Sequence, residues 1–348
     1  MPTDARRSRR LVDRLVAPYV NGLADHLARV QDSVLDLHDR LRWVEDRLRE
    51  EPEQRERSLA KVEARLDEIA DRSAAARSRS ALDRQMLREI HERGDEQRRR
   101  LYELRRSEAY ELAFTEDRPL VSFVVPTFDR HELLRERSLP SILNQNYENL
   151  EVIVSGDGSP PETEQAIKDL DDPRLRFLNR TVRGPYPETA EKRWLMAGTP
   201  PLNDGVAAAR GRWIAILGDD DEVCPEHTER LLAAAQESRL EHCYGRLAIR
   251  FADGGELDWE SKFPPEYGYY TLQLAIYHAG LRFFQFEPAD VLYGEPNDWS
   301  LARRMIAAGV RFGKIDELVT YKHEDRPTPR RSPDSPVAAR EPREPASS

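Results

Sequence analysis

A short apolar run, Trp213–Leu217, leads through Gly218 into three consecutive aspartates, Asp219, Asp220 and Asp221. An apolar run of this length is typical of a buried strand, so the acids must begin where the strand leaves the core. Three adjacent carboxylates repel one another unless a positive charge neutralises them. A divalent cation held by carboxylate and phosphate oxygens would provide that charge. The plain alternative is a solvated acidic loop.

The region from Pro119 to about residue 325 alternates short β-rich runs with helical stretches. This alternation is typical of βαβ units on a largely parallel sheet. We predict strands at Val121–Pro126, Leu150–Ser155, Arg174–Leu178 and Trp213–Leu217. We predict helices at Glu132–Asn144, Thr163–Leu170, Asp204–Arg210, Pro225–Ser238 and Asp298–Ala308, and a hairpin formed by Cys243–Phe251 and Glu256–Trp259.

Residues 1–115 follow a different pattern. From Val16 to Leu48, apolar residues recur at alternating steps of four and three, which is a heptad seam. Pro52 interrupts the seam, and it resumes in another phase at Leu59. A long polar helix with one apolar seam needs a partner helix. We therefore predict an extended coiled coil, and we favour self-association of chains over an antiparallel hairpin within one chain.

Composition narrows the functional classes. The 348 residues carry a net charge of −10, which argues against a nucleic-acid binder. Two cysteines suggest no disulfide framework and fit a reducing compartment. No signal peptide and no apolar stretch long enough to span a membrane are seen. We expect a cytoplasmic protein that is compatible with peripheral attachment at the inner face of a membrane. The Pro- and Arg-rich tail, 326–348, is expected to be disordered.

Polar segments follow three of the predicted strands. They are Pro126–Arg130, Gly156–Ser159 and Asp219–Asp221. Each alone could be a simple turn. In open α/β sheets, however, ligands bind beyond the carboxyl ends of the strands, so the three segments together predict one binding edge.

With these motifs, residues 119–325 resemble an inverting, GT-A-type glycosyltransferase of family two. The matching segments are Pro126-Thr-Phe-Asp-Arg130, Gly156-Asp-Gly-Ser159, Asn203-Asp-Gly205, Ala209-Arg-Gly211, Gly218-Asp-Asp-Asp221 with Pro225, Gly294-Glu-Pro-Asn-Asp298, Ala308-Gly309 and Tyr321-Lys-His323. The resemblance implies an α/β, GT-A-like fold whose mainly parallel sheet is flanked by helices. With the preceding coiled coil, the expected domains are 1–115, 116–325 and a tail at 326–348.

The resemblance also implies roles for particular residues. Those expected to bind the nucleotide sugar are Pro126, Thr127, Asp129, Asp157, Asn203 and Asp219. Mg²⁺ or Mn²⁺ is expected at Asp220, Asp221 and His323, bridging the donor diphosphate. Inversion needs a base that deprotonates the acceptor hydroxyl, and Asp298 is our choice, with Glu295 second. The structural alternative for Asp298 is a helix N-cap.

Three positions depart from the family pattern. Gly156 and Gly218 stand where the family has Asp, and Leu202 replaces an Arg that would contact phosphate. Lys192 or Arg193 is our candidate for the missing positive charge.

The expected function is metal-dependent transfer of a sugar to a glycan, lipid-linked or other hydroxyl acceptor, in polysaccharide biosynthesis. One alternative is a degenerate transferase-like domain that serves as a coiled-coil scaffold. A nucleotidyltransferase is a third class, but it would need a Gly-rich loop after the first strand, and Pro126–Arg130 contains no glycine.

Overall fold

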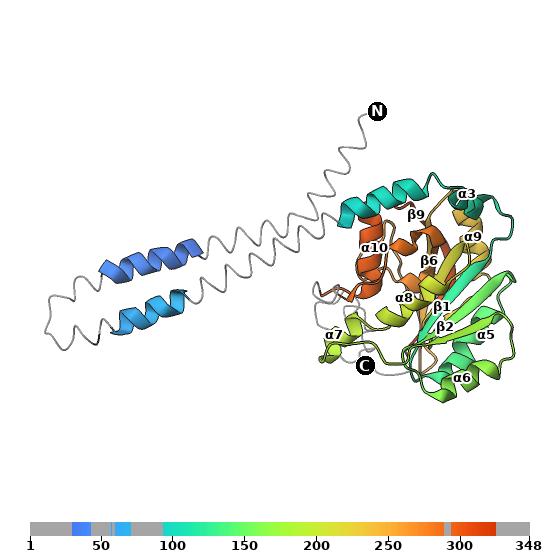
Figure 1. The fold of residues 1–348 in the computed structure, drawn as a ribbon, viewed down its shortest axis with the longest axis horizontal. Helices are drawn as coiled ribbons and strands as arrows, with labels where there is room; N and C mark the ends of the chain where they lie inside the picture. Colours follow the sequence, from blue (N-terminus) through green and yellow to red (C-terminus); the bar gives the residue numbers. More distant parts are fainter. Residues whose placement is uncertain (1–29, 43–56, 58–59, 71–92, 289–293, 325–348) are drawn as a thin grey trace, which may run out of the picture. The chain divides into compact units, whose positions relative to one another are not determined.

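The computed structural model describes residues 30–42, 57, 60–70, 93–288 and 294–324 (Figure 1). The chain divides into two compact units, Met1–Arg88 and Glu89–Ser348. Much of the predicted coiled coil and the whole tail 326–348 lie outside the described residues. No helix within the described ranges is both long and apolar enough to cross a bilayer.

In the first unit, residues 30–42 and 60–70 are helical. Most of their seam side chains are exposed, and Val34 retains 60 % of its accessible surface. The other exposed apolar side chains of these two helices are Val30, Leu35, Leu41, Leu66 and Ile69. Apolar surface of this kind favours association, so pairing between chains stays a prediction that these residues motivate.

The second unit is built on one sheet whose described strands run in the order β3-β2-β1-β4-β8-β6-β9-β5, with β7 paired to β6. The strands are β1 (Val121–Thr127), β2 (Leu150–Gly156), β3 (Leu175–Asn179), β4 (Trp213–Ile216), β5 (Glu222–Val223), β6 (His242–Phe251), β7 (Glu256–Trp259), β8 (Ala275–His278) and β9 (Phe312–Glu324). The first four strands in this order are parallel. Beyond them, β8 is antiparallel to β4 and β6, and β9 runs parallel to β6.

Helices cover both faces of the sheet (Figure 1). They are α3 (Glu108–Thr115), α4 (His131–Leu133), η1 (Leu134–Ser138), α5 (Leu139–Leu143), α6 (Pro161–Lys168), α7 (Ala190–Leu195), α8 (Thr199–Ala208), α9 (His227–Glu237) and α10 (Asn297–Ala308), with short 3₁₀ segments η2 (Leu272–Leu274) and η3 (Ala279–Phe283). Because successive strand residues point to opposite faces, Val124 and Phe123 enter two different cores. The predicted α/β, GT-A-like sheet flanked by helices is confirmed.

The four predicted strands and the hairpin are present, but several other bounds differ. The helix predicted at Asp204–Arg210 begins at Thr199, because Pro200 and Pro201 lie in its first turn, where proline costs no hydrogen bond. The helix predicted at Glu132–Asn144 is divided by the π-turn η1. Helix α7, strand β8 and the 13-residue strand β9 had no equivalent in the predicted elements.

Residues 93–115 belong to the sheet unit rather than to the first unit. Leu101 and Tyr110 are buried there, and the Trp213 indole donates to the Ala113 carbonyl at 3.0 Å. Arg105 pairs with the fully buried Glu241. The contacts thus divide the chain earlier than residue 115. The limits 1–115, 116–325 and 326–348 stay a prediction about functional domains.

Candidate functional site

The carboxyl ends of β1, β2 and β4 meet at one edge, as expected for parallel strands. Thr127 ends β1, and its hydroxyl donates to Asp219 Oδ2 at 2.8 Å. Asp157 follows β2, and its backbone N–H donates to the Thr127 carbonyl at 2.9 Å. Three of the predicted binding residues therefore lie together, and Pro126 stands next to them at the end of β1.

Two of the three consecutive aspartates share one cation. Arg130 Nη1 lies 3.2 Å from Asp219 Oδ1 and also contacts Asp220. Burial raises the pKa of the Asp219 carboxyl to about 6, and the Asp220 charge adds to the rise. Arg130 and the Thr127 hydroxyl act in the opposite direction but do not restore the ordinary value. The pair is therefore only partly neutralised by the protein itself.

The Asp221 carboxylate contacts two segments from the second half of the unit, η2 and β9. Its Oδ2 accepts from Gln273 Nε2 at 2.7 Å, and its Oδ1 accepts from the His323 backbone N–H at 2.9 Å. Burial raises the pKa of this carboxyl, and the nearby Lys322 charge opposes that rise. The His323 ring does not face the aspartates, since its Nε2 lies 3.2 Å from Glu222 Oε2.

The expected metal residues therefore do not form a protein-only cage. Within the described residues, no group of three or more His, Cys, Asp or Glu side chains is arranged to hold a metal ion. Asp219 and Asp220 do converge on a single positive charge, the Arg130 guanidinium. Mg²⁺ is commonly bound through one or two carboxylates together with substrate phosphates, and this donor set fits that mode.

The segment after β3 covers Asp157. The Gly184 N–H donates to Asp157 Oδ1 at 2.9 Å, and the Tyr186 hydroxyl donates to Oδ2. The Arg183 guanidinium lies 3.7 Å from the centre of the Phe128 ring. Asp157 is accordingly buried, with its carboxylate engaged by its own chain.

The remaining predicted donor residues lie in different settings. Asp129 is exposed beside this edge. Asn203 is in α8, where its amide donates to the Phe286 carbonyl at 2.8 Å and accepts from the Phe286 N–H at 3.0 Å. Arg193 donates to the carbonyls of Pro187 and Glu188 within its own segment. Asn203 thus fixes a neighbouring segment. The cations near the three aspartates include Arg130, Lys322 and Arg137, which donates to the Asp220 carbonyl at 2.8 Å.

Asp298 lies in the first turn of α10, and Pro296 holds the N-cap position. The N-cap alternative for Asp298 is therefore wrong. Its Oδ1 accepts from the Trp299 N–H at 2.7 Å, and the Thr271 hydroxyl and the Leu272 N–H also bond to the carboxyl. Burial raises the pKa of Asp298 against these hydrogen bonds.

Glu295, the second choice for the base, is in a different state. It pairs with Arg303 at 2.9 Å. Its carboxylate is thus already engaged by a neighbouring arginine of the same chain.

Segment η2 and its flanks join the two halves of the site. Gln273 bonds to Asp221, while Thr271 and Leu272 bond to Asp298. The Thr320 hydroxyl on β9 donates to the Gln273 carbonyl at 2.9 Å. The aspartates after β4 and the acid of α10 thus face one region. Lys322 also belongs to it, a residue for which the Tyr321-Lys-His323 motif was the only sequence signal.

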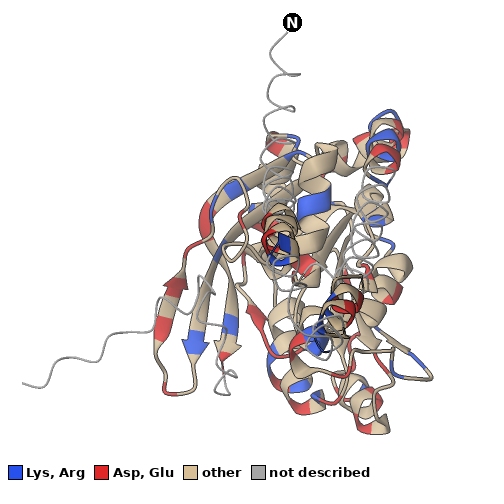
Figure 2. Cartoon of the chain, turned by 90° about the vertical axis from the view of Figure 1, so that its left-hand side faces the viewer, with Lys and Arg blue, Asp and Glu red and all other residues tan. Residues whose placement is uncertain are grey.

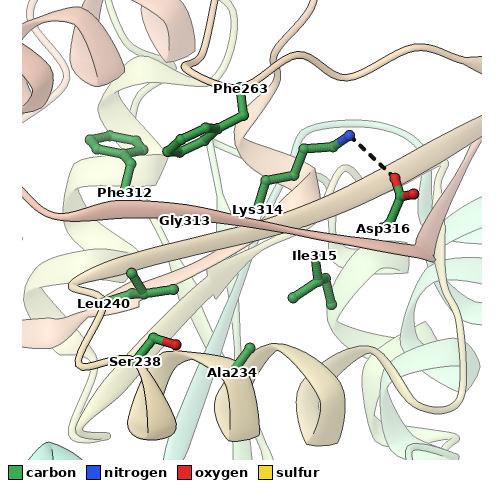
Figure 3. A pocket seen from close by; sticks show the side chains of 9 residues that line it. All are labelled: Ala234, Ser238, Leu240, Phe263, Phe312, Gly313, Lys314, Ile315 and Asp316. Carbon is green, nitrogen blue, oxygen red and sulfur yellow. Dashed lines mark hydrogen bonds and ion pairs between the residues drawn. The ribbon is translucent and has the colours of Figure 1, made fainter.

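A separate cavity of about 570 Å³ lies at the beginning of β9 (Figure 3). Its lining residues are Ala234, Ser238, Leu240, Phe263, Phe312, Gly313, Lys314, Ile315 and Asp316. The lining residues from β9, Phe312–Asp316, are at the start of the strand, whereas Lys322 and His323 are near its end. The cavity is not part of the acidic site.

Comparison with known proteins identifies the domain. The family model described as glycosyl transferase family 2 matches residues 122–187 and 200–294. The chain is 34 % identical over 135 residues to the GalNAc(5)-diNAcBac-PP-undecaprenol beta-1,3-glucosyltransferase of Campylobacter jejuni, a match that covers 38 % of this chain and 39 % of that protein. It is 33 % identical over 141 residues to the succinoglycan biosynthesis protein ExoO of Rhizobium meliloti, covering 40 % and 36 %.

The chain thus spans less than half the length of these curated relatives. A similar solved structure is S. aureus TarS 1–349 in complex with UDP-GlcNAc, with 17 % identity, a TM-score of 0.48 and coverage of 62 % of each chain. The family match leaves out residues 188–199, which contain α7. It includes the strand-end motifs and all three aspartates, so residues 122–294 form a glycosyl transferase family 2 domain, and Asp298 and Lys322 lie beyond the matched residues.

Proposed function

We propose that this protein transfers a sugar, with inversion, from a nucleotide-sugar donor to an acceptor hydroxyl. One observation carries the proposal. The partly neutralised pair Asp219 and Asp220 is followed directly by Asp221, which Gln273 joins to η2, and the residues beside Gln273 contact Asp298. This arrangement supports placing the leaving diphosphate at the aspartates and the base at Asp298.

The donor binds at the edge formed by β1, β2 and β4. Pro126, Thr127, Asp129 and Asp157 would hold its base and ribose, with Asn203 behind them. For the base to reach Asp157, the hydrogen bonds from Gly184 and Tyr186 must be exchanged for bonds to the donor. The segment after β3 is therefore expected to rearrange when the donor binds.

Mg²⁺ or Mn²⁺ would be held chiefly by Asp219 and Asp220, with Asp221 and His323 at the rear of the site. The ion, when bound, would neutralise charge on the donor diphosphate. The chain's own contribution is to keep two carboxylates close together and incompletely compensated, as the raised pKa of Asp219 indicates. When the ion binds, the Arg130 guanidinium must share the Asp219 and Asp220 carboxylates with it or move away from them.

Asp298 would accept the proton of the acceptor hydroxyl. A base should have a pKa nearer to the working pH than an ordinary aspartate has, and burial shifts Asp298 in that direction. Three hydrogen bonds to its carboxyl keep the group oriented.

The names of two relatives suggest the acceptor class. One acts on an undecaprenol diphosphate-linked glycan, and the other belongs to succinoglycan biosynthesis. We therefore propose a glycan or lipid-linked acceptor in polysaccharide biosynthesis, for a cytoplasmic enzyme that attaches peripherally to the inner face of a membrane. The exposed seam of residues 30–42 and 60–70 would mediate self-association. A catalytically degenerate scaffold is the competing function.

The test is a panel of UDP-, GDP- and dTDP-sugars with Mn²⁺ or Mg²⁺, assayed for transfer and for slow hydrolysis. Wild type should release one nucleotide in a metal-dependent manner, and Asp298→Asn should lower kcat by about 10²–10⁴-fold. Glu295→Gln is the matched control and should stay within about threefold of wild type, because its charge serves Arg303. Metal-dependent nucleotide binding without turnover by any donor and acceptor would favour the scaffold. Equal losses in both variants would remove Asp298 as the base.

A further inference from the structure

We propose that the side-chain ammonium of Lys322 binds the diphosphate of the donor and stabilises it as the sugar departs. This inference rests on the proposed function and adds a residue to it. The sequence analysis placed the missing positive charge on Lys192 or Arg193. The arrangement around β9 points to Lys322 instead.

The register of β9 fixes where Lys322 lies. Tyr321 pairs with Glu222, the residue directly after the three aspartates, and the His323 N–H donates to Asp221. Lys322 therefore sits between two residues whose backbone adjoins the acidic loop. Its Cα is one residue from the donor of the 2.9 Å bond to Asp221.

The alternation of side chains along the strand fixes the face. Tyr321 lies under the Arg250 guanidinium, and the His323 ring lies at Glu222, which also pairs with Arg250, so both occupy one face. Thr320 occupies the other face, where it bonds to the Gln273 carbonyl. Lys322 is two residues from Thr320 and shares its face. It therefore points to η2, which bonds to both Asp221 and Asp298.

The charge of Lys322 acts on both sides of the site. It opposes the rise in pKa of Asp221 and of Asp298. Even so, across the described part of the chain, its ammonium forms no hydrogen bond and no ion pair. An ammonium has three donors, and here they are available to a ligand that enters between the two acids. Arg130 is already held by Asp219 and Asp220, and Arg137 donates to the Asp220 carbonyl at 2.8 Å.

The transfer step defines what the ammonium would do. The acceptor oxygen forms a bond to the anomeric carbon and gives its proton to Asp298. The bond from that carbon to the phosphate oxygen breaks, and its electron pair remains on the diphosphate. Negative charge thus increases on the diphosphate during the step, and a fixed cation facing that charge lowers the barrier.

The experiment compares Lys322→Met, Lys322→Arg and the control Lys314→Met. Lys314 is on the same strand but beside Asp316, at 3.4 Å, away from the acids (Figure 3). Each protein is assayed for kcat and donor KM with the donor found active in the panel. Each is also titrated with UDP, GDP and dTDP and with the corresponding monophosphates, in the presence of Mn²⁺.

Lys322→Met should lose about 10²–10³-fold in kcat. It should bind the diphosphate at least about tenfold more weakly while its affinity for the monophosphate changes little. Lys322→Arg should recover most of the diphosphate affinity, and Lys314→Met should match wild type. A residue that only supports the fold would weaken both nucleotides equally and would not be rescued by arginine.

Unchanged diphosphate affinity and kcat in a folded Lys322→Met protein would overturn the inference while leaving the proposed function intact. If wild type binds a diphosphate but transfers no sugar, the proposed function fails and the titration still tests Lys322. A wild type that binds none of the diphosphates would overturn both.

Discussion

Two buried acidic groups of the sheet unit are handled in opposite ways. Glu241, at the start of β6, is fully enclosed. Arg105 binds both of its oxygens, at 2.6 and 2.7 Å, and the Tyr110 hydroxyl and the Arg311 N–H each donate at 2.8 Å. Although burial alone would raise it, the pKa of Glu241 is held below its ordinary value by these partners.

Asp219 and Asp221, which follow β4, are also buried but are not compensated in this way. Asp219 shares Arg130 with Asp220, and its pKa rises to about 6. Burial also raises the pKa of Asp221, which accepts hydrogen bonds from the Gln273 amide and the His323 backbone N–H.

The comparison teaches how to separate structural from functional acids. Acidic and basic residues are interspersed over the unit (Figure 2), so local partners rather than a general field set the difference. An acid that the chain neutralises completely holds elements together. An acid pair left short of positive charge at a sheet edge is ready to accept a cation from a ligand. Glu241 joins residues 105–110 to the sheet, and Asp219 and Asp220 face the candidate site.

The largest expected effect comes from Glu241→Gln. The change removes the fully buried carboxylate charge and leaves the half-buried Arg105 guanidinium without its ionic partner, and we expect a loss of about 3–5 kcal/mol in the free energy of unfolding. Urea denaturation followed by circular dichroism measures it. Glu148→Gln, whose side chain is 86 % exposed, is the control and should change stability by less than about 0.5 kcal/mol. A loss in Glu241→Gln as small as in the control would break the comparison.

The two groups also differ in how visible they are in the sequence. The aspartates could be predicted because the signal lies in a few consecutive residues: an apolar run, then Gly218 and three aspartates. The partners of Glu241, among them Arg105 and Tyr110, lie more than one hundred residues away along the chain, at separations of 136 and 131. A short motif contains no information about such pairing, so neither Glu241 nor the packing of residues 93–115 was predicted.

The same distinction explains the other differences within the site. The parallel strands and their edge were predictable from apolar runs and the polar residues after them. Lys322 was not singled out, because its position depends on the register of β9 with β5. The helix predicted from Asp204 in fact starts at Thr199, with Pro200 and Pro201 in its first turn, where proline is tolerated.

The second effect is on transfer. Asp219→Asn removes one of the two carboxylates that would hold the cation, and we expect kcat to fall by about 10²–10³-fold. Stability at neutral pH should not fall, because the variant removes a buried charge whose pKa is raised. Activity and urea denaturation measured on the same samples check both parts. A variant that loses stability as strongly as Glu241→Gln would place Asp219 among the structural acids.

The smallest effect, and the sharpest test of the contrast, is the dependence of stability on pH. The folded state holds the Asp219 proton up to about pH 6, above the ordinary value of 3.8, so this group stabilises the fold below pH 3.8 and loses that contribution as pH rises through 6. The contribution of Glu241 to stability has the opposite sign: it is present above pH 4.5 and is lost as pH falls through the lowered pKa of Glu241.

Between pH 4 and pH 7, the free energy of unfolding of Asp219→Asn should therefore rise by about 2 kcal/mol relative to that of wild type. His227 and His242, whose pKa values burial lowers to about 4 and about 3, titrate in both proteins and cancel from the difference. A difference that stays flat with pH would mean that Arg130 neutralises Asp219 as completely as Arg105 neutralises Glu241.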